Sequence, residues 1–262
     1  MKFLTLNCHS WLEDNQEEKI KIIAKTIKEK NYDVIALQEV NQHIEGNLVC
    51  GKVNDRNFAL VLLNELKQLG CSEYKMLWDY SHIAYGIYEE GISIITKHQI
   101  EEGHSFFVSR SKDKAFWKCR KVLGASIKIN EEIIDFYSCH LGWWQDDEES
   151  FTEQVDKLLN DTKKDRLTFL MGDFNNNAFV RNEGYDYLIK KGMYDTFSIA
   201  RERDCGVTVK GKIAGWDLNE NDLRIDLILA NQKVDVKYSK VIFNNINEPI
   251  VSDHYGVEVE IV

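Results

Sequence analysis

The chain has 262 residues, of which 44% are hydrophobic and 29% charged, a composition that excludes an intrinsically disordered protein. Acidic side chains outnumber basic ones by 43 to 33, which gives a net charge of −10 at pH 7. Because basic side chains supply most of the affinity for a nucleic-acid backbone, this balance disfavours a long polyanionic substrate and favours a small one. The length predicts a single domain, 1–262, with a large core.

The N-terminal segment is predicted to be a strand and not a signal peptide, because polar residues begin at Asn7 before any apolar h-region forms. No later segment approaches membrane-spanning length. The six cysteines include no Cys-x-x-Cys pair, which favours buried thiols over a disulfide framework or a zinc site. We therefore predict a cytoplasmic protein, and we expect a monomer.

The N-terminal half alternates between strand and helix patterns. A strand at residues 2–6 precedes a helix with a capped start at 14–17 and apolar residues at helical spacing up to Ile27. A short buried strand follows at 34–37. A second amphipathic helix runs from Phe58 to Leu69 and stops at Gly70. The next predicted strand is 92–96.

The C-terminal half is richer in strands. Two strands, 122–129 and 133–140, are joined at Asn130 and Glu131. Helices are predicted at 151–159 and 185–191, and further strands at 167–171, 224–229, 234–243 and 255–262. The chain has one proline and no internal repeat or low-complexity linker. A mixed α/β fold with sheets inside and helices outside accounts for this order.

Polar residues stand at the ends of several predicted strands, where strand ends direct side chains to a common rim. They are Asn7, Glu39, His140, Asp173, Asn175, Asp253 and His254. Asp226 lies within an apolar stretch at 224–229, where a carboxylate needs a partner to be buried. Taken singly, each such residue is commonly a turn former or a surface group. Their shared structural context instead predicts a functional site.

The residue types suit the hydrolysis of a phosphate ester. Glu39, Asp253 and Asn7 offer the hard oxygen ligands that Mg²⁺ or Mn²⁺ prefers, and the lack of a compact His/Cys cluster argues against zinc. A phosphoryl group at such a metal also needs an in-line water, a base and donors for developing charge. Asp173 is the predicted base, and the predicted donors are His140, His254 and Asn175.

The motifs that contain these residues resemble those of the exonuclease–endonuclease–phosphatase (deoxyribonuclease-I-like) superfamily. They are Leu-Asn at 6–7, Gln-Glu-Val at 38–40, Ser-Cys-His-Leu at 138–141, Gly-Asp-Phe-Asn at 172–175, Arg-Ile-Asp at 224–226 and Ser-Asp-His at 252–254. The superfamily includes deoxyribonuclease I, apurinic endonucleases, bacterial sphingomyelinases and inositol-polyphosphate phosphatases. The resemblance implies a four-layer α/β sandwich, in which two mixed β-sheets lie face to face between helices.

The resemblance also implies a role for each motif residue. Glu39 corresponds to the principal metal ligand, assisted by Asn7 and Asp253. Asp173 resembles the base that orients water, and Asn175 its neighbour on the scissile phosphate. His254 and His140 resemble the phosphate-binding pair, with Asp226 as the carboxylate that orients His254 and favours its charged form.

Two weaker matches extend the site. Tyr88 and Glu90 resemble a Tyr-x-Glu element of the nuclease branch, in which the tyrosine donates to the phosphate and the glutamate holds the histidine equivalent to His140. The alternative is that both belong to a surface loop. Arg120 lies near the position of a phosphate-contacting arginine in some members.

Tryptophans near the predicted rim suggest what the substrate carries. Trp143 and Trp144 follow His140, and Trp216 lies in the loop that leads to Asp226. Indoles stack on sugars and on bases, although either of the paired tryptophans could instead pack under the sheet. These segments are similar to those of a bacterial subgroup that includes maltose 6′-phosphate phosphatase, which implies a phosphomonoesterase acting on a sugar phosphate.

Three alternatives remain open at this point. A phosphodiesterase acting on DNA or RNA would need a basic groove, which the acidic chain disfavours. A sphingomyelinase-like enzyme is disfavoured because that branch is typically secreted. A non-catalytic binding module would have lost a ligand or a catalytic histidine, whereas every such position is occupied here.

Overall fold

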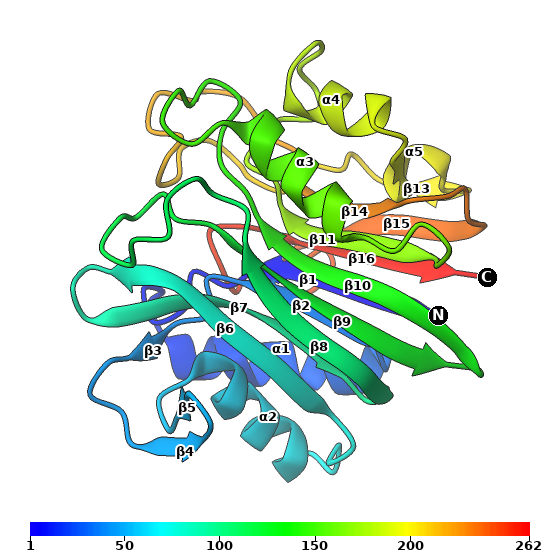
Figure 1. Ribbon diagram of the computed structural model, residues 1–262. Coiled ribbons are helices and arrows are strands. Elements are labelled where there is room, and N and C mark those ends of the chain that lie inside the picture. The colour runs from blue at the N-terminus through cyan, green and yellow to red at the C-terminus, as the bar shows by residue number, and fades with distance from the viewer.

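The computed structural model describes residues 1–262 and has four layers, with two β-sheets face to face between two layers of helices (Figure 1). Helices α1 (Gln16–Lys30) and α2 (Phe58–Gln68) cover one sheet. Helices α3 (Phe151–Asp161) and α4 (Gly184–Lys190) cover the other, and a short α5 (Thr196–Ile199) lies at its edge. The predicted four-layer α/β sandwich is confirmed.

The larger sheet has eight strands. In spatial order they are β13 (Glu202–Arg203), β15 (Val236–Ile242), β16 (Gly256–Ile261), β1 (Lys2–Asn7), β2 (Val34–Gln38), β7 (Tyr88–Thr96) and β3 (Gln42–His43), with β6 (Lys75–Ala84) also paired to β7. Strands β1 and β2 are parallel, with Asn7 opposite Gln38. Their carboxyl ends therefore share one edge of the sheet.

The smaller sheet has six strands. In spatial order they are β12 (Tyr194–Asp195), β14 (Asp226–Ala230), β11 (Thr168–Asp173), β10 (Glu132–His140), β9 (Lys121–Ile129) and β8 (Gln99–Phe107). Strands β10 and β11 are parallel, and their last pair is His140 opposite Asp173. A separate two-stranded ribbon joins β4 (Leu48–Cys50) and β5 (Val53–Asn54).

Aromatic side chains fill the space between the sheets. Phe3 of β1 packs edge-on against Phe136 of β10 and Phe169 of β11, with ring centroids 5.0 and 4.8 Å apart. The neighbouring residue in β1, Leu4, points to the opposite face and belongs to the cluster under α1 and α2. Both faces of the central strands are thus buried, which is why these strands are apolar along their length.

Most predicted elements are present. The missed strands are the two long strands β6 and β8 and the two- or three-residue strands β3, β4, β5, β12 and β13. Strands β6 and β8 were not predicted because they contain many polar residues, and β8 is an edge strand whose residues are all at least partly exposed. The predicted turn between β9 and β10 is confirmed: Asn130 and Glu131 both have positive φ, 49° and 68°, as a tight hairpin turn needs. Helix α1 begins after Asn15 without the predicted side-chain cap. None of the helices is long and apolar enough to cross a bilayer.

Candidate active site

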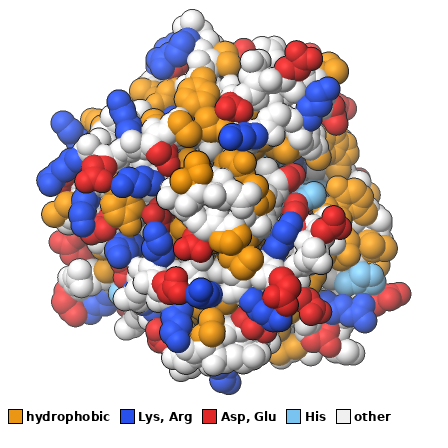
Figure 2. All heavy atoms as spheres, turned by 180° about the vertical axis from the view of Figure 1, so that it is seen from behind, with side chains coloured by type: hydrophobic (Ala, Val, Ile, Leu, Met, Phe, Trp, Pro, Cys, Tyr) orange, Lys and Arg blue, Asp and Glu red, His pale blue; other side chains and the backbone are white.

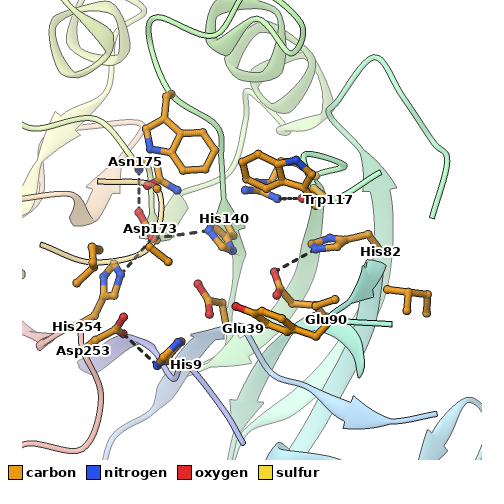
Figure 3. Close-up of a pocket in the computed structure, with 18 residues that line it drawn as sticks. His9, Glu39, His82, Glu90, Trp117, His140, Asp173, Asn175, Asp253 and His254 are labelled. Atoms are coloured by element: carbon orange, nitrogen blue, oxygen red, sulfur yellow. Dashed lines mark hydrogen bonds and ion pairs between the residues drawn. The ribbon is translucent and has the colours of Figure 1, made fainter. Parts of the chain in front are cut away.

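A pocket of about 350 Å³ opens at the rim where the two sheets end (Figure 3). Nine of the predicted site residues line it: Glu39, Glu90, Arg120, His140, Trp143, Asp173, Asn175, Asp253 and His254. They come from both sheets and from the loops that follow their strands. Parallel pairing explains the convergence, because β1 with β2 and β10 with β11 each end together.

Asn7 links the two sheets at the base of the pocket. Its side-chain Nδ2 donates to Glu39 Oε1 at 2.9 Å, on the same sheet, and to Asp173 Oδ2 at 3.2 Å, on the facing sheet. Asn7 is fully buried. It therefore fixes the spacing between a predicted metal ligand and the predicted base.

Several residues that line the pocket have an unusual backbone conformation. Four lining residues other than glycine have a left-handed backbone: His9 with φ 41°, Glu39 with φ 49°, Tyr85 with φ 52° and Asn175 with φ 49°. Such conformations each cost free energy and persist where the surroundings impose them, which is common at functional sites.

A buried row of charged groups runs through the site from Asp226 to Asp173. His254 Nδ1 lies 3.0 Å from Asp226 Oδ2, and His254 Nε2 lies 3.8 Å from Asp173 Oδ2. Burial alone would lower the pKa of His254, but the carboxylates of Asp226 and Asp173 outweigh it and raise the pKa to about 10. His254 is therefore an imidazolium at neutral pH, as the predicted pairing with Asp226 requires.

The second histidine of the predicted pair differs in charge. Burial, together with the nearby Arg120, His254 and His82, holds the pKa of His140 well below its ordinary value. Its Nε2 lies 3.8 Å from Asp173 Oδ2. The pocket thus combines one charged and one neutral imidazole on the two sides of Asp173.

Asn175 is held rigidly beside Asp173. Its backbone N–H donates to Asp173 Oδ1 at 2.8 Å, and its side-chain Nδ2 donates to the Leu141 carbonyl at 3.0 Å. Its Oδ1 accepts from Trp216 Nε1 at 3.0 Å. Trp216, predicted to bind substrate, does not line the pocket, and its contact with the site is this hydrogen bond to Asn175.

Two of the three predicted metal ligands lie on one side of the pocket and fit a hard divalent cation, and the third, Asn7, lies behind them without lining the pocket. Glu39 and Asp253 both line it, and Glu39 has no basic side chain within ion-pair distance. Glu90 is partly buried beside Glu39, and desolvation together with the Glu39 charge raises its pKa to about 8. This local excess of carboxylate charge is what a divalent cation would neutralise.

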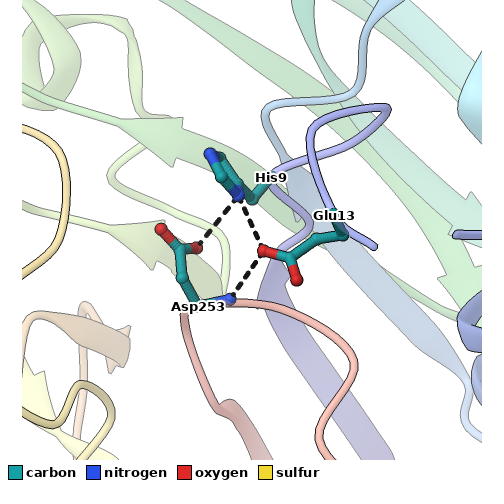
Figure 4. A group of neighbouring side chains, drawn as sticks. All are labelled: His9, Glu13 and Asp253. Carbon is teal, nitrogen blue, oxygen red and sulfur yellow. Dashed lines mark hydrogen bonds and ion pairs between the residues drawn. The ribbon is translucent and has the colours of Figure 1, made fainter. Parts of the chain in front are cut away.

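Asp253 is supported by His9 and Glu13 (Figure 4). Its backbone N–H donates to Glu13 Oε1 at 3.2 Å, and the same oxygen lies 2.7 Å from His9 Nδ1. His9 Nδ1 is also 3.8 Å from Asp253 Oδ1. The cluster ties the loop before β16 to the loop after β1.

The adjacent residues Trp143 and Trp144 have different surroundings in the structure. Trp143 lines the pocket, whereas Trp144 packs against Phe151 of α3 and Tyr187 of α4, with ring centroids 6.2 and 6.1 Å away. A turn begins at Trp143, closed by the Asp146 N–H that donates to the Trp143 carbonyl at 3.3 Å, and the two indoles leave it towards different parts of the molecule. Trp144 therefore belongs to the layer of helices, and its predicted contact with substrate does not fit its position.

Of the two residues in the weak Tyr-x-Glu match, only Glu90 lies at the active-site pocket. Tyr88 packs against His43, with ring centroids 5.7 Å apart, and lines a different hollow. Glu90 does line the active-site pocket, but its Oε1 lies 3.7 Å from His82 Nε2, so its partner is His82 and not the predicted His140. Tyr88 is the first residue of β7 and Glu90 lies two residues further along the strand, and only Glu90 borders the active-site pocket.

Several lining residues were not predicted. His9, His82, Tyr85 and Trp117 all face the pocket, together with the loop 213–215. His82 and Tyr85 lie in and just after β6, a strand that the sequence pattern did not reveal. His9, only two residues after Asn7, is the one whose position in a motif could have drawn attention to it.

The fold and the site together have the features of a hydrolase of phosphate esters: a buried aspartate, a histidine between two aspartates and further carboxylates, all at one rim of a four-layer sandwich. The model of the Endonuclease/Exonuclease/phosphatase family matches residues 5–254, and the chain belongs to this family. Members of the family hydrolyse phosphoesters, and they typically depend on divalent metal ions.

Solved structures agree with this assignment. An endonuclease/exonuclease/phosphatase family protein from Leptotrichia buccalis is 40% identical, with a TM-score of 0.95 over 100% of this chain and 99% of that one. A mannosyl-6-phosphatase from Bacteroides thetaiotaomicron has the same fold at 18% identity, with a TM-score of 0.72 over 100% and 99% of the two chains. D. rerio TDP2 humanized by 14 mutations matches at 14% identity, with a TM-score of 0.65 over 100% and 98%. Comparison with curated proteins gave no match.

Proposed function

We propose that this protein is a phosphomonoesterase that uses Mg²⁺, or Mn²⁺ in its place, to hydrolyse a sugar phosphate such as maltose 6′-phosphate. The observation that carries the proposal is the composition of one pocket of about 350 Å³, in which Asp173, His254 and Arg120 share the space with Trp117 and Trp143. Pockets of this size hold small ligands. Charged groups for a phosphoryl group and indoles for a sugar ring are both within it.

Arg120 is suited to bind the phosphoryl group. It is only 4% exposed, yet its guanidinium donates to backbone carbonyls alone, those of Trp117 at 2.9 Å and Cys119 at 3.4 Å. Its Nε has no hydrogen-bond partner. A buried guanidinium without a carboxylate partner leaves its charge available to an anion.

The residues around Asp173 would divide the chemistry among them. Glu39 and Asp253, with Asn7 behind them, would hold the divalent cation, which when bound supplies positive charge to the phosphoryl oxygens. Asp173, fixed by Asn7 and by the Asn175 N–H, would orient the attacking water and accept its proton. His254 would donate to a phosphoryl oxygen from Nε2, while Asp226 holds its Nδ1–H.

A nuclease remains the main competing function, and the distribution of charge disfavours it. The face shown in Figure 2 has acidic and basic side chains interspersed, without a continuous basic band. Next to the pocket lie three acidic residues, Asp146, Asp147 and Glu148. A nucleic-acid backbone laid across them would meet like charge.

The test is metal-dependent release of phosphate from a panel of monoesters. Maltose 6′-phosphate, glucose 6-phosphate and an aryl phosphate would be assayed with Mg²⁺ and with EDTA, beside plasmid DNA, abasic duplex and sphingomyelin. We expect strong release from a sugar phosphate that EDTA abolishes. Undiminished activity in EDTA would exclude the metal mechanism. Inert sugar phosphates combined with cleaved DNA or lipid would exclude the proposed substrate class.

A further inference from the structure

A second hollow lies directly outside the aromatic wall of the active-site pocket. Its volume is about 560 Å³, and it shares Trp117, Trp143 and Gly215 with the pocket. Its remaining wall is mostly polar and includes the acidic segment Asp146, Asp147 and Glu148. We call it the outer hollow. A ligand that fills the pocket and is longer than it would extend into this hollow.

The outer hollow is built from two loops that are tied together. Lys118 Nζ, in the loop between β8 and β9, lies 2.9 Å from Asp146 Oδ2 and 2.6 Å from Glu148 Oε2, in the loop after β10. Glu149, only 2% exposed, accepts the backbone N–H groups of Arg110 and Ser111 at 2.6 and 2.8 Å. The two loops therefore hold their shape before any ligand arrives, which reduces the entropy lost on binding.

Trp117 presents a free aromatic surface to this space. Its side chain is 52% exposed, and its ring is tilted by 58° against that of Trp143, with centroids 5.8 Å apart. It belongs to none of the hydrophobic clusters of the core. Trp117 therefore contributes little to the core and lies where the pocket and the outer hollow meet. In this position its indole is available to stack on a ring of a bound ligand.

On the other side of the junction, the Trp143 ring packs directly on Gly215. Its φ is 79°, and a Cβ built on it would lie 2.5 Å from the Trp143 ring. The adjacent Trp216 donates to Asn175 beside the predicted base. The segment 215–216, which contacts Trp143 between the pocket and the outer hollow, is thus also hydrogen-bonded to Asn175 in the active site.

We propose that the outer hollow is a second sugar subsite, which binds an uncharged glycosyl unit attached to the phosphorylated sugar. This inference rests on the proposed function and specifies its substrate as a phosphorylated disaccharide or longer saccharide. Trp117 would stack on the second ring, and the carboxylates of the rim would accept its hydroxyl hydrogens.

The negative charge at the edge of the outer hollow should also disfavour substrates that carry a second anionic group. Asp146, Asp147 and Glu148 carry three negative charges, of which Lys118 offsets one. Asp147 has no ionic partner of its own among these groups. A second phosphate on the substrate would meet net negative charge here, so the subsite discriminates by repulsion as well as by contact.

The first test compares substrates with zero, one and two rings: an aryl phosphate, glucose 6-phosphate and maltose 6′-phosphate. For the wild type we expect kcat/KM to be highest on the two-ring substrate. Trp117→Ala should lower kcat/KM on that substrate about ten- to a hundredfold, the effect of losing one stacked ring, and lower it less on the other two. Trp144→Phe is the matched control, because Trp144 packs against α3 and α4, and its kinetics should equal those of the wild type.

The outcomes separate the subsite from the proposed function. Equal turnover of the one-ring and two-ring substrates, with equal losses in Trp117→Ala, would overturn the subsite while the sugar-phosphate assignment stands. Hydrolysis of the aryl phosphate without hydrolysis of either sugar phosphate would overturn the proposed function itself. A preference for nucleoside monophosphates that Trp117→Ala abolishes would show that a base and not a sugar occupies the hollow.

A second test addresses charge. The wild type should hydrolyse glucose 1,6-bisphosphate less efficiently than glucose 6-phosphate, and Asp147→Lys should narrow that ratio severalfold by reversing one charge of the rim. The measured quantity is the ratio of the two kcat/KM values in each variant. A ratio that Asp147→Lys leaves unchanged would overturn the electrostatic part of the proposal.

Discussion

Two buried aspartates in this molecule have opposite surroundings. Asp79 of β6 is 2% exposed and accepts hydrogen bonds from Lys52, Lys121 and Ser105. Burial would raise its pKa, but Lys121, Lys52 and Ser105 outweigh it and lower the pKa to about 2. Asp173 of β11 is 1% exposed, and burial together with the nearby Asp226 raises its pKa to about 7 despite the opposing effect of His254.

The comparison distinguishes a structural cluster from a functional one. The charge of Asp79 is fully matched by the two lysines within the protein, so nothing further is needed to make its burial acceptable. The Asp173 cluster has more carboxylates than cations, and a bound cation is what would complete it. Residue type and burial are the same in both, and only the partners differ.

The largest expected effect comes from Asp173→Asn. Loss of the predicted base should reduce kcat on a phosphomonoester by about a thousandfold or more. The melting temperature should not fall, because the substitution removes a buried negative charge that lies near Asp226. Steady-state kinetics and thermal unfolding measure the two quantities, and Asp165→Asn, at an exposed carboxylate away from the pocket and the outer hollow, serves as the control. Activity near that of the wild type would refute the assignment of Asp173.

Asp79→Ala should show the reverse pattern. It leaves Lys121, whose side chain is 13% exposed, without its partner, so we expect a loss of about 3 kcal/mol in the free energy of unfolding. Activity of the folded fraction should remain near that of the wild type. Urea unfolding and kinetics at low temperature check both parts. A large loss of activity without a loss of stability would mean that the Asp79 cluster serves the active site.

The ionic role of Asp79 can also be tested through the pH dependence of the free energy of unfolding. Because the folded-state pKa of Asp79 is about 2, below the value of about 3.9 for an unfolded chain, its ionised form stabilises the protein above about pH 4. That contribution, about 1–2 kcal/mol after allowance for solvent screening at the half-exposed Lys52, is lost as the pH falls through 2. The difference in unfolding free energy between the wild type and Asp79→Asn should be constant from pH 5 to 8 and shrink below pH 4. A difference independent of pH down to 2 would contradict the ionic role.

Much of the Asp173 cluster could be predicted from the sequence, and the Asp79 cluster could not. Asp173, Asn175 and His254 lie in short motifs at strand ends, and strand ends meet at a rim whenever the strands are parallel. Asp79 lies in β6, which the sequence pattern did not reveal, and its partners come from residues 52, 105 and 121. Nothing local signals such long-range pairing.

The same reasoning explains the success and failure among the aromatic residues. Trp143 follows a strand-end motif, so its place at the rim could be predicted, although the sequence could not show which of Trp143 and Trp144 faces inward. Trp117 lies in a loop whose path depends on Lys118 and on two backbone contacts to Glu149. Loop conformations of this kind are set by tertiary contacts and carry no periodic signal.

A smaller loss of activity than that of Asp173→Asn is expected at Trp216, which links the loop before β14 to the active site. Trp216→Phe keeps the aromatic packing against Val209, Leu223 and Ile225 but removes the N–H that Asn175 Oδ1 accepts at 3.0 Å. The freed amide can rotate, so we expect kcat on an aryl phosphate to fall about tenfold. KM and the melting temperature should change little. This separation of kcat from KM distinguishes a positioning residue from one that binds substrate: a rise in KM with constant kcat would mean that Trp216 contacts the substrate after all.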